Sequence, residues 1–313
     1  MRAALLVVNP YATTTSARTR EVLVSALEGE LKLDVVHTDH RGHAAEVARQ
    51  ARVDGLDLVV TLGGDGTVNE VVNGLLDPGG PDPDVPALAV VPGGGTNVFA
   101  RALGLPRDPV EATGVLLAAL RARRSRSIGL GRAGDRWFTF NAGMGWDAEV
   151  VARVDRGRLK RGTTRRTTSG DYVRAAVAEY FLSTDRRHPV LTAYRPGAEP
   201  LSGLHLTIIA NTAPWTYLGD RPLLTSPRAS FDTGLDLYAL TRLGTASTLL
   251  EARRLVKGRS GDGDGRAVHR EHDLAELTLR AVRPVAAQVD GEPLGERTEL
   301  TFRSVPGAVR VVL

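Results

Sequence analysis

The first 125 residues alternate between short apolar runs and amphipathic stretches, which predicts successive β-α units. The apolar runs that predict strands cover residues 3–8, 33–38, 58–62 and 86–91. Apolar positions at helical spacing lie between and after them, for example over residues 44–51 and 110–120. Units of this length build a doubly wound parallel sheet, in which ligands bind beyond the C-terminal ends of the strands.

The pattern changes after about residue 127. Short strand-like runs separated by turns cover residues 137–141, 190–194, 204–210, 235–240 and 274–282. Two stretches, Tyr172–Phe181 and Ser247–Leu255, have helical spacing instead. We therefore expect an α/β fold with a doubly wound domain over residues 1–127, to which a last strand at about 305–313 can return. A mostly antiparallel, sandwich-like β domain is expected over residues 128–304.

A glycine-rich turn follows the third apolar run. Residues 58–70 read LVVTLGGDGTVNE, a buried strand, three glycines around Asp65, and the start of a helix. Glycines can adopt positive φ and let phosphate oxygens approach the backbone, and a helix N-terminus attracts anions. Asp65 cannot itself attract a phosphate, so we expect it to hold Mg²⁺ or to accept a proton. For one such motif alone, a structural turn is the alternative.

A second glycine loop strengthens the interpretation as a phosphate site. The fourth apolar run ends in PGGGTN at residues 92–97, followed by a short helix at 98–103. In a parallel sheet both loops lie at the same edge, where ligands bind.

The composition narrows the class of partner. A length of 313 residues allows two domains, and a net charge of +4 favours anionic partners without indicating nucleic acid. The absence of cysteine excludes disulfides and thiolate metal sites and fits a reducing cytoplasm. Because no apolar run reaches membrane-spanning length, we expect any membrane contact to be peripheral. The first apolar run ends at Asn9-Pro10 and is expected to be a strand, not a signal peptide.

Three further patterns favour ordinary structure over chemistry. Residues 129–134 have the spacing G-x-G-x-x-G, but a strand follows at 137–140, which predicts a hairpin. The triplet-spaced His37, His40 and His43 span a strand end, a loop and a helix start, which favours solvated surface over a metal site. Residues 258–266 lack the closing Glu of a calcium loop.

Two charged segments each leave two interpretations open. Residues 153–166 hold seven basic residues and one acidic residue, Asp155, which is typical of a solvated loop or of a patch that docks on an anionic membrane. The strand-like residues 285–289 lead into Asp290 and Glu292. These carboxylates mark a hairpin tip, or they supply the proton acceptor that a hydroxyl needs when it attacks phosphorus.

Taken together, the motifs resemble the diacylglycerol kinase-type lipid kinase family, which includes sphingosine and ceramide kinases. The resemblance covers nearly the whole chain and follows the family order through Asn9-Pro10, His37-Thr38 and residues 63–70, 92–103, 141–147 and 289–292. The box Gly-Gly-Asp-Gly-Thr also occurs in NAD kinases, whereas the later Gly-Thr-Asn-x-Phe-Ala-Arg and Asp-Gly-Glu elements discriminate between the two.

The resemblance implies an ATP-dependent, Mg²⁺-requiring kinase with its active site in the cleft between the domains. It implies that Asp65 joins the Mg²⁺–phosphate assembly and that the base is Asp290, Glu292 or Asp65. It further implies nucleotide contacts at Asn9, Pro10, Thr38, Gly63, Gly64, Asp65, Gly66, Thr67, Asn69, Glu70, Gly94, Gly95, Thr96 and Asn97. Residues that could line a lipid groove are Phe181, Trp215, Tyr217 and Leu218.

The chain departs from the family pattern at two positions. Val98 stands where the family often has Asp, so a carboxylate on the substrate side is missing. The turn Asp232-Thr233-Gly234 replaces the Asp-Asp-Gly turn near which some bacterial relatives bind a structural Mg²⁺, so we do not expect that site.

The resemblance makes diacylglycerol, which would give phosphatidic acid, the first acceptor to consider. A sphingoid base or another lipid alcohol, NAD, and a non-catalytic nucleotide- or lipid-binding regulator follow in that order. The retained Asp65, Asp290 and Glu292 disfavour the regulator. We expect a cytoplasmic protein that associates peripherally with an anionic membrane surface at the inner face, with no nucleic-acid partner. The sequence leaves a homodimer open.

Overall fold

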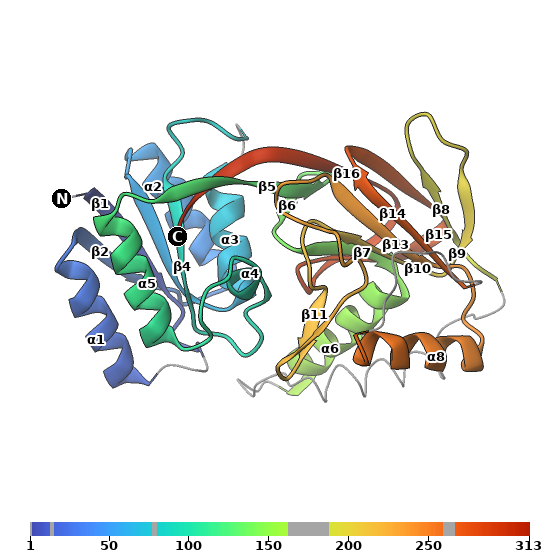
Figure 1. The fold of residues 1–313 in the computed structure, drawn as a ribbon, viewed down its shortest axis with the longest axis horizontal. Helices are drawn as coiled ribbons and strands as arrows, with labels where there is room; N and C mark the ends of the chain where they lie inside the picture. The colour runs from blue at the N-terminus through green and yellow to red at the C-terminus, as the bar shows by residue number, and fades with distance from the viewer. Residues whose placement is uncertain (1, 13–15, 77–79, 162–187, 259–266) are drawn as a thin grey trace. The chain divides into compact units, whose positions relative to one another are not determined.

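The computed structural model describes residues 2–12, 16–76, 80–161, 188–258 and 267–313 (Figure 1). The chain forms two compact units. Unit 1 comprises residues 1–129 and 307–313, and unit 2 comprises residues 130–306. The helix expected at Tyr172–Phe181 lies outside the described residues.

Unit 1 contains a parallel sheet. The strands β1 (Arg2–Val8), β2 (Leu31–His37), β3 (Leu58–Gly63) and β4 (Ala87–Pro92) pair in the order β4-β3-β1-β2. Every residue of β3 and β4 is buried, as expected for parallel strands that are covered on both faces. The far end of the last strand, β16 (Glu292–Val312), pairs in parallel with β4 through Val311 and Leu88.

The helices of unit 1 are α1 (Ala17–Glu28), α2 (His43–Val53), α3 (Asp65–Leu76), α4 (Val98–Ala102) and α5 (Pro109–Arg121). Side chains cap two of them in the usual way. Ser16 accepts a hydrogen bond from the amide of Thr19 at the start of α1, and Asp108 accepts from two amides at the start of α5. The apolar positions of these helices pack on the strands, with Leu23, Leu27 and Leu116 in the core.

Close packing of α2 on α3 requires a glycine at residue 74. A Cβ atom there would lie 2.2 Å from the carbonyl oxygen of Ala45, whereas a Cβ at Gly114 in α5 would meet nothing within 4 Å. We expect Gly74→Ala to lower the free energy of unfolding by about 1–3 kcal/mol through overpacking. We expect Gly114→Ala to raise it by about 0.5–1 kcal/mol, because alanine is the better helix former. Urea unfolding of both variants checks this, and equal effects would contradict it.

Unit 2 contains a mostly antiparallel sheet in the order β14-β13-β10-β7-β15-β16. Its strands are β7 (Asn141–Gly145), β8 (Leu191–Tyr194), β9 (Leu201–Leu204), β10 (Leu206–Ala210), β13 (Leu235–Leu240), β14 (Val268–Leu274), β15 (Glu276–Val289) and the start of β16. The strand β5 (Ser125–Ala133) forms the predicted hairpin with β6 (Arg136–Phe138). A separate small hairpin pairs β11 (Thr216–Leu218) with β12 (Arg221–Leu223).

The described helices of unit 2 are α6 (Trp146–Arg161) and α8 (Thr245–Val256). The core of the unit packs around Phe138 and Phe302, whose rings meet edge to face with centroids 6.5 Å apart. The predicted fold class, a doubly wound α/β domain followed by a mostly antiparallel β domain, is confirmed. Among the described residues, no helix combines the length and the apolar character that crossing a membrane requires.

Candidate active site

The C-terminal ends of the parallel strands in unit 1 bring the predicted nucleotide residues together. The amide of Asn9, just after β1, bonds to β3, and the amide of Thr38, just after β2, bonds to β1. The amide of Gly93, just after β4, donates to the carbonyl oxygen of Gly63 at 2.7 Å. The two glycine loops and the ends of β1 and β2 therefore share one edge of the sheet, as the sequence predicts.

The two glycine loops pack backbone against backbone. A Cβ atom at Gly94 would lie 2.7 Å from the Cα atom of Gly64, and one at Gly63 would lie 2.7 Å from the side chain of Thr67. Neither Gly63 nor Gly64 has a positive φ, so neither uses the conformational freedom that glycine allows. Space, not backbone conformation, explains why these two positions are glycine.

The carboxylate of Asp65 joins the two loops. Its Oδ2 accepts a hydrogen bond from the amide of Val98 at 2.9 Å, and its Oδ1 accepts one from the amide of Phe99 at 3.0 Å. These two hydrogen bonds cap the start of α4, and Asp65 makes them from the first position of α3. The sequence predicts metal binding or proton transfer for Asp65, and the structure adds the capping of α4 as a further role. Each carboxylate oxygen has a second lone pair, so Asp65 can cap α4 and still face a cation.

Several predicted nucleotide residues are buried and hold the loops in place. The Asn9 amide group donates to the Thr67 hydroxyl at 3.2 Å. Asn97, with φ of 50°, bonds to both the amide and the carbonyl of Gly94. Asn69 accepts a hydrogen bond from the Asn73 side chain.

Glu70 has a similar supporting role. Its carboxylate accepts hydrogen bonds from the amides of Gly42 and Ala44, at 2.9 and 3.2 Å, and so caps the start of α2. The predicted residues that are exposed or half-buried, and therefore accessible to a ligand, are Asn9, Pro10, Thr38, Gly64, Asp65, Gly66, Glu70, Gly94, Gly95 and Thr96.

In unit 2 the predicted carboxylates lie at a two-residue hairpin turn between β15 and β16. Val289 pairs with Glu292, and the intervening Asp290 and Gly291 have φ of 47° and 78°. Asp-Gly is a preferred sequence for a two-residue turn with positive φ at both positions. The turn explains why this dipeptide occurs here.

Four donors surround the buried carboxylate of Asp290. The backbone amide and the hydroxyl of Thr139 donate to Oδ2 at 2.7 and 2.8 Å. The amides of Phe140 and Asn141 donate to Oδ1 at 3.0 and 3.1 Å. Asp290 is therefore fixed to the segment that precedes β7. Glu292, two residues later, is half-buried at the first position of β16.

Gln288 connects this turn to a buried acid. Its amide group donates to the Asn141 side chain at 3.0 Å and to Oδ2 of Asp147 at 2.9 Å. Its carbonyl oxygen accepts from the amide of Gly291 at 2.9 Å. Burial raises the pKa of Asp147 to about 6, against a smaller opposing effect of the Gln288 hydrogen bond.

The raised pKa of Asp147 makes stability depend on pH. The folded protein binds this proton more tightly than the unfolded chain, so the stabilisation is present below pH 4 and is lost as the pH rises through about 6. From pH 4.5 to 7.5 we expect Asp147 to lower the free energy of unfolding by about 2 kcal/mol. In Asp147→Asn this part of the pH dependence should disappear. Urea unfolding at both pH values checks this, and unchanged pH dependence in the variant would contradict it.

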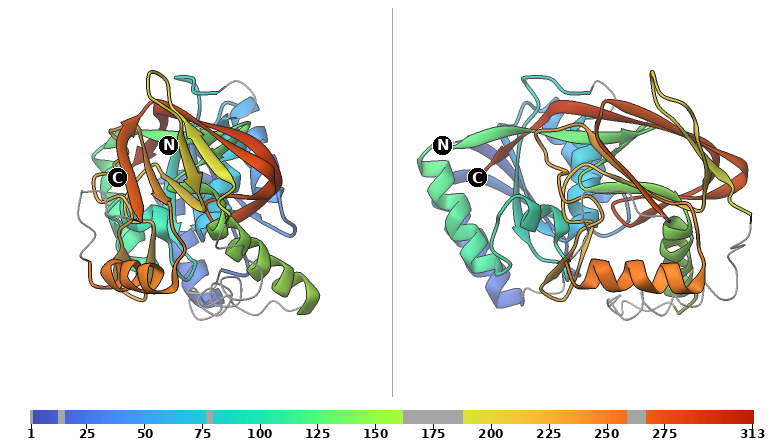
Figure 2. Two further views of the ribbon diagram at one scale, coloured as in Figure 1. Left: turned by 90° about the vertical axis from the view of Figure 1, so that its right-hand side faces the viewer. Right: turned by 45° about the vertical axis from the view of Figure 1, so that its right-hand side comes forward.

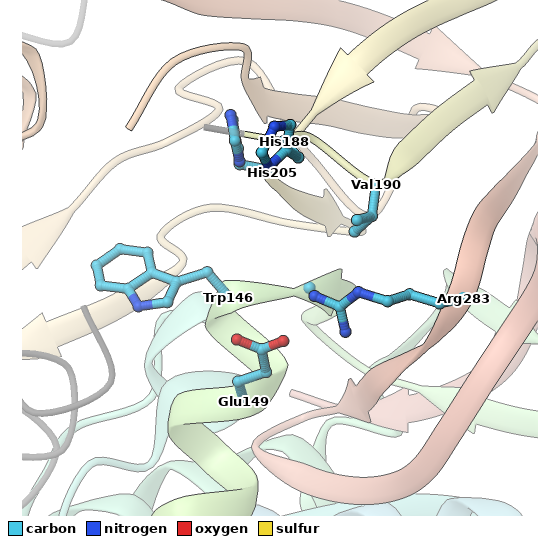
Figure 3. Close-up of a pocket in the computed structure, with 7 residues that line it drawn as sticks. Trp146, Glu149, His188, Val190, His205 and Arg283 are labelled. Atoms are coloured by element: carbon cyan, nitrogen blue, oxygen red, sulfur yellow. The ribbon is translucent and has the colours of Figure 1, made fainter. Parts of the chain in front are cut away.

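A small pocket in unit 2 adjoins the start of α6 (Figure 3). Glu149 comes from α6, and Arg283 comes from β15. Among the described residues, the lining consists of Gly145, Trp146, Glu149, His188, Val190, His205 and Arg283. None of the residues expected to line a lipid groove belongs to this pocket. Trp215 packs against a different apolar cluster, Tyr217 and Leu218 lie in β11, and Phe181 lies outside the described residues.

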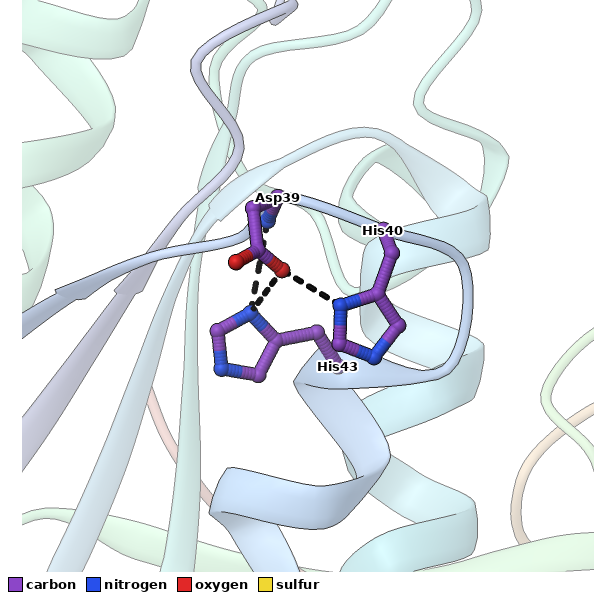
Figure 4. Close-up of side chains that lie close together, drawn as sticks. All are labelled: Asp39, His40 and His43. Atoms are coloured by element: carbon purple, nitrogen blue, oxygen red, sulfur yellow. Dashed lines mark hydrogen bonds and ion pairs between the residues drawn. The ribbon is translucent and has the colours of Figure 1, made fainter.

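A second group of polar side chains lies on the surface of unit 1 (Figure 4). Asp39 contacts the imidazole of His40 and bonds to that of His43 at 2.8 Å, and the two rings stack with centroids 4.9 Å apart. The hydrogen bond between Asp39 and His40 lowers the pKa of Asp39 and raises the pKa of His40. Their ligand atoms lie close enough for a metal ion. One exposed carboxylate shared by two imidazoles accounts for this geometry without an ion.

Sequence reasoning missed the residues that hold the turn in unit 2. Thr139 has no motif of its own, and Gln288 and Asp147 were noted only inside longer segments. The one usable signal was the position of Gln288, two residues before Asp290 at the end of the predicted strand.

Comparisons with known proteins give the family context. Residues 3–133 match the family model of the diacylglycerol kinase catalytic domain. A diacylglycerol kinase of Bacillus subtilis is 39% identical over 114 residues, which cover 36% of this chain and 35% of that protein. A protein of Chromohalobacter salexigens named "Probable lipid kinase YegS-like" is 37% identical over 132 residues, or 42% of this chain and 40% of its own. The matches thus span well under half the length of these curated relatives.

Solved structures match over nearly the whole chain. A diacylglycerol kinase from Bacillus anthracis superposes with a TM-score of 0.71 at 18% identity, covering 99% of this chain and 96% of that one. An NAD kinase from Archaeoglobus fulgidus in complex with ATP superposes with a TM-score of 0.53 at 10% identity, covering 100% and 94%. These likenesses establish the fold. Together with the sequence matches, they confirm the predicted resemblance to the diacylglycerol kinase-type lipid kinase family.

Proposed function

We propose that this chain, whose residues 3–133 match the diacylglycerol kinase catalytic domain, transfers the γ-phosphate of ATP to a lipid hydroxyl. The observation that carries the proposal is the contact between Gly64 and Gly94, which Asp65 fixes by capping α4. Two glycine loops held together at the C-terminal edge of a parallel sheet form a rigid surface of backbone amides. Such a surface suits a polyphosphate.

The residues of unit 1 fit a nucleotide and its metal ion. The first turn of α3 offers amides that have no partner within the helix, and the half-buried Gly64, Gly66 and Gly94 leave room for phosphate oxygens. Mg²⁺, when bound with ATP, neutralises charge on the phosphates. It is held in proteins by one or two carboxylates together with substrate phosphates. In this chain Asp65 is the carboxylate that we assign to it.

We assign the role of base to Glu292. Each oxygen of the buried Asp290 carboxylate already accepts two hydrogen bonds, and Asp65 is the carboxylate that we assign to Mg²⁺, whereas Glu292 is half-buried at the start of β16. Glu292 takes the proton of the lipid hydroxyl, whose oxygen forms a bond to the γ-phosphorus. The bond from that phosphorus to the bridging oxygen breaks, and the products are a lipid phosphate and ADP. The buried Asp290 and Gln288 keep the turn, and with it Glu292, in one position.

Diacylglycerol is the acceptor that we propose first, because relatives with the name diacylglycerol kinase match the chain. The second relative carries the broader name of lipid kinase, so other lipid alcohols follow. A lipid acceptor implies a protein that meets an anionic membrane surface from the cytoplasm, which agrees with the net charge of +4. Whether two copies associate does not enter the proposal.

The test measures transfer of labelled γ-phosphate from Mg-ATP to diacylglycerol in mixed micelles, with sphingosine and NAD in parallel reactions. We expect label in phosphatidic acid, at least about 100-fold less in Glu292→Gln, and no change in Glu296→Gln. Glu296 is a matched control because it is an exposed glutamate on the same strand. Label in NADP alone would overturn the lipid assignment, and no transfer to any acceptor would overturn the kinase.

A further inference from the structure

The helix α8 has the reverse of the usual amphipathic arrangement. Its one buried residue is the charged Glu251, while Leu249, Leu250 and Val256 are 65%, 50% and 38% exposed. A helix that packs on a protein core normally turns its apolar side inward. Figures 1 and 2 show α8 along the margin of unit 2, in orange.

A polar anchor sets this orientation. Glu251 accepts hydrogen bonds from the Tyr238 hydroxyl at 3.2 Å and from the Arg270 guanidinium at 2.9 Å. The guanidinium in turn lies 4.9 Å from the centre of the Tyr238 ring. Rotating α8 to bury its leucines would break these contacts and leave Arg270 without its carboxylate partner, which is costly for a buried charge. Leu249 and Leu250 therefore remain on the outside, whereas Leu255 is half-buried.

The outward face of α8 also carries positive charge only. Positions 246, 249, 250, 253, 256 and 257 share one side of the helix, since they follow the helical repeat. Arg253 and Lys257 lie among the exposed apolar side chains on that side. The helix has one acidic residue, Glu251, and that residue is buried. Basic side chains among apolar ones suit a lipid–water interface, because their stems can lie along apolar surface while their charges stay at the headgroups.

We propose that the outward face of α8 docks on an anionic bilayer. Leu249, Leu250 and Val256 enter the headgroup region, while Arg253 and Lys257 pair with lipid phosphates. A second copy of the same face would place like charges against each other, so charge complementarity favours lipid over self-association. The inference rests on the proposed function in one respect, that a lipid kinase takes its acceptor from a bilayer. The basic stretch at 153–166, by contrast, has side chains that lie partly outside the described residues.

The test is co-sedimentation with vesicles of phosphatidylcholine and phosphatidylglycerol in equal parts, and with vesicles of phosphatidylcholine alone. We compare Leu249→Glu/Leu250→Glu with a control, Val22→Glu/Val110→Glu, whose sites are 56% and 53% exposed in unit 1. Both variants lose two exposed apolar side chains and gain two negative charges. The α8 variant should bind anionic vesicles at least about tenfold more weakly than the native protein, while the control binds within about twofold of it. Equal binding by all three proteins would overturn the proposal.

Activity and oligomeric state separate this inference from the proposed function. With a short-chain diacylglycerol dissolved as monomers, the α8 variant should phosphorylate as fast as the native protein, because no bilayer is involved. If the native protein binds vesicles through α8 but phosphorylates no acceptor, the docking surface stands and the kinase proposal fails. If phosphatidic acid forms but vesicle binding is independent of α8, the kinase proposal stands and the docking surface fails. Loss of a dimer in the α8 variant, by sedimentation velocity, would identify a second copy as the occupant and overturn docking on lipid.

Discussion

Replacing Asp290 by asparagine should lower the free energy of unfolding by about 3 kcal/mol or more. The carboxylate accepts four hydrogen bonds from residues 139–141, and all four partners are donors. In the variant, the amide nitrogen of asparagine would replace one of the two carboxylate oxygens. It would then face donors of residues 139–141 and leave them without an acceptor. Urea unfolding at pH 7 measures the loss, and the transition midpoint should fall clearly below that of the native protein.

Comparison with Glu292→Gln separates an effect on stability from an effect on transfer. We expect this variant to unfold at nearly the same urea concentration as the native protein while losing transfer, because glutamine keeps the size and an acceptor oxygen of the half-buried Glu292 side chain but does not take up the proton. If instead Asp290→Asn were as stable as the native protein and lost only transfer, then Asp290 would be the better assignment for the base. The results that we expect would instead identify Asp290 as the residue that anchors the turn and Glu292 as the residue that takes the proton.

Replacing Asp65 by asparagine should reduce phosphate transfer by about 100-fold or more and lower the free energy of unfolding by about 1–2 kcal/mol. The stability loss follows from the cap of α4, because one carboxylate oxygen that accepts an amide becomes a donor. The loss of transfer follows from the missing negative charge beside the two glycine loops, where we assign Mg²⁺, and from any shift of the second loop. Steady-state kinetics with Mg-ATP, together with thermal unfolding, measures both effects.

Asp108 provides a matched control for Asp65. It also accepts hydrogen bonds from two backbone amides at a helix start, those of Val110 and Glu111, but it does so at α5 and is not a residue of either glycine loop. Asn is as good a cap as Asp, so Asp108→Asn should change stability by only a few tenths of a kcal/mol and leave transfer intact. Equal loss of transfer in both variants would show that the effect is not specific to the carboxylate of Asp65.

The sequence could predict those parts of the fold that depend on neighbouring residues. The strands β1, β3 and β4 are mostly apolar runs, and the two glycine loops directly follow β3 and β4, so the meeting of the loops at one edge follows from the parallel topology. The hairpin turn at Asp290-Gly291 is likewise encoded in two adjacent residues. These elements needed no knowledge of distant contacts.

The roles of the carboxylates could not be predicted in the same way. Asp65 meets its partners 33 and 34 residues later in the chain, and Asp290 meets its partners about 150 residues earlier. A residue type that suits metal binding, proton transfer and helix capping equally well does not reveal which partner it has. The helix α8 shows a related limit. Its periodicity predicts a helix, but only the buried contacts of Glu251 determine which side faces inward.

The path of β16 has a consequence for how the protein can be divided. The strand begins at Glu292 in unit 2, and its last residues lie beside β4 in unit 1. A fragment that stops at residue 129 would therefore expose the backbone of β4 as a bare edge, which is a template for aggregation. A fragment that carries residues 307–313 joined ahead of residue 1 by a flexible linker would supply the missing neighbour. A fragment meant to contain unit 1 alone therefore has to include residues 307–313.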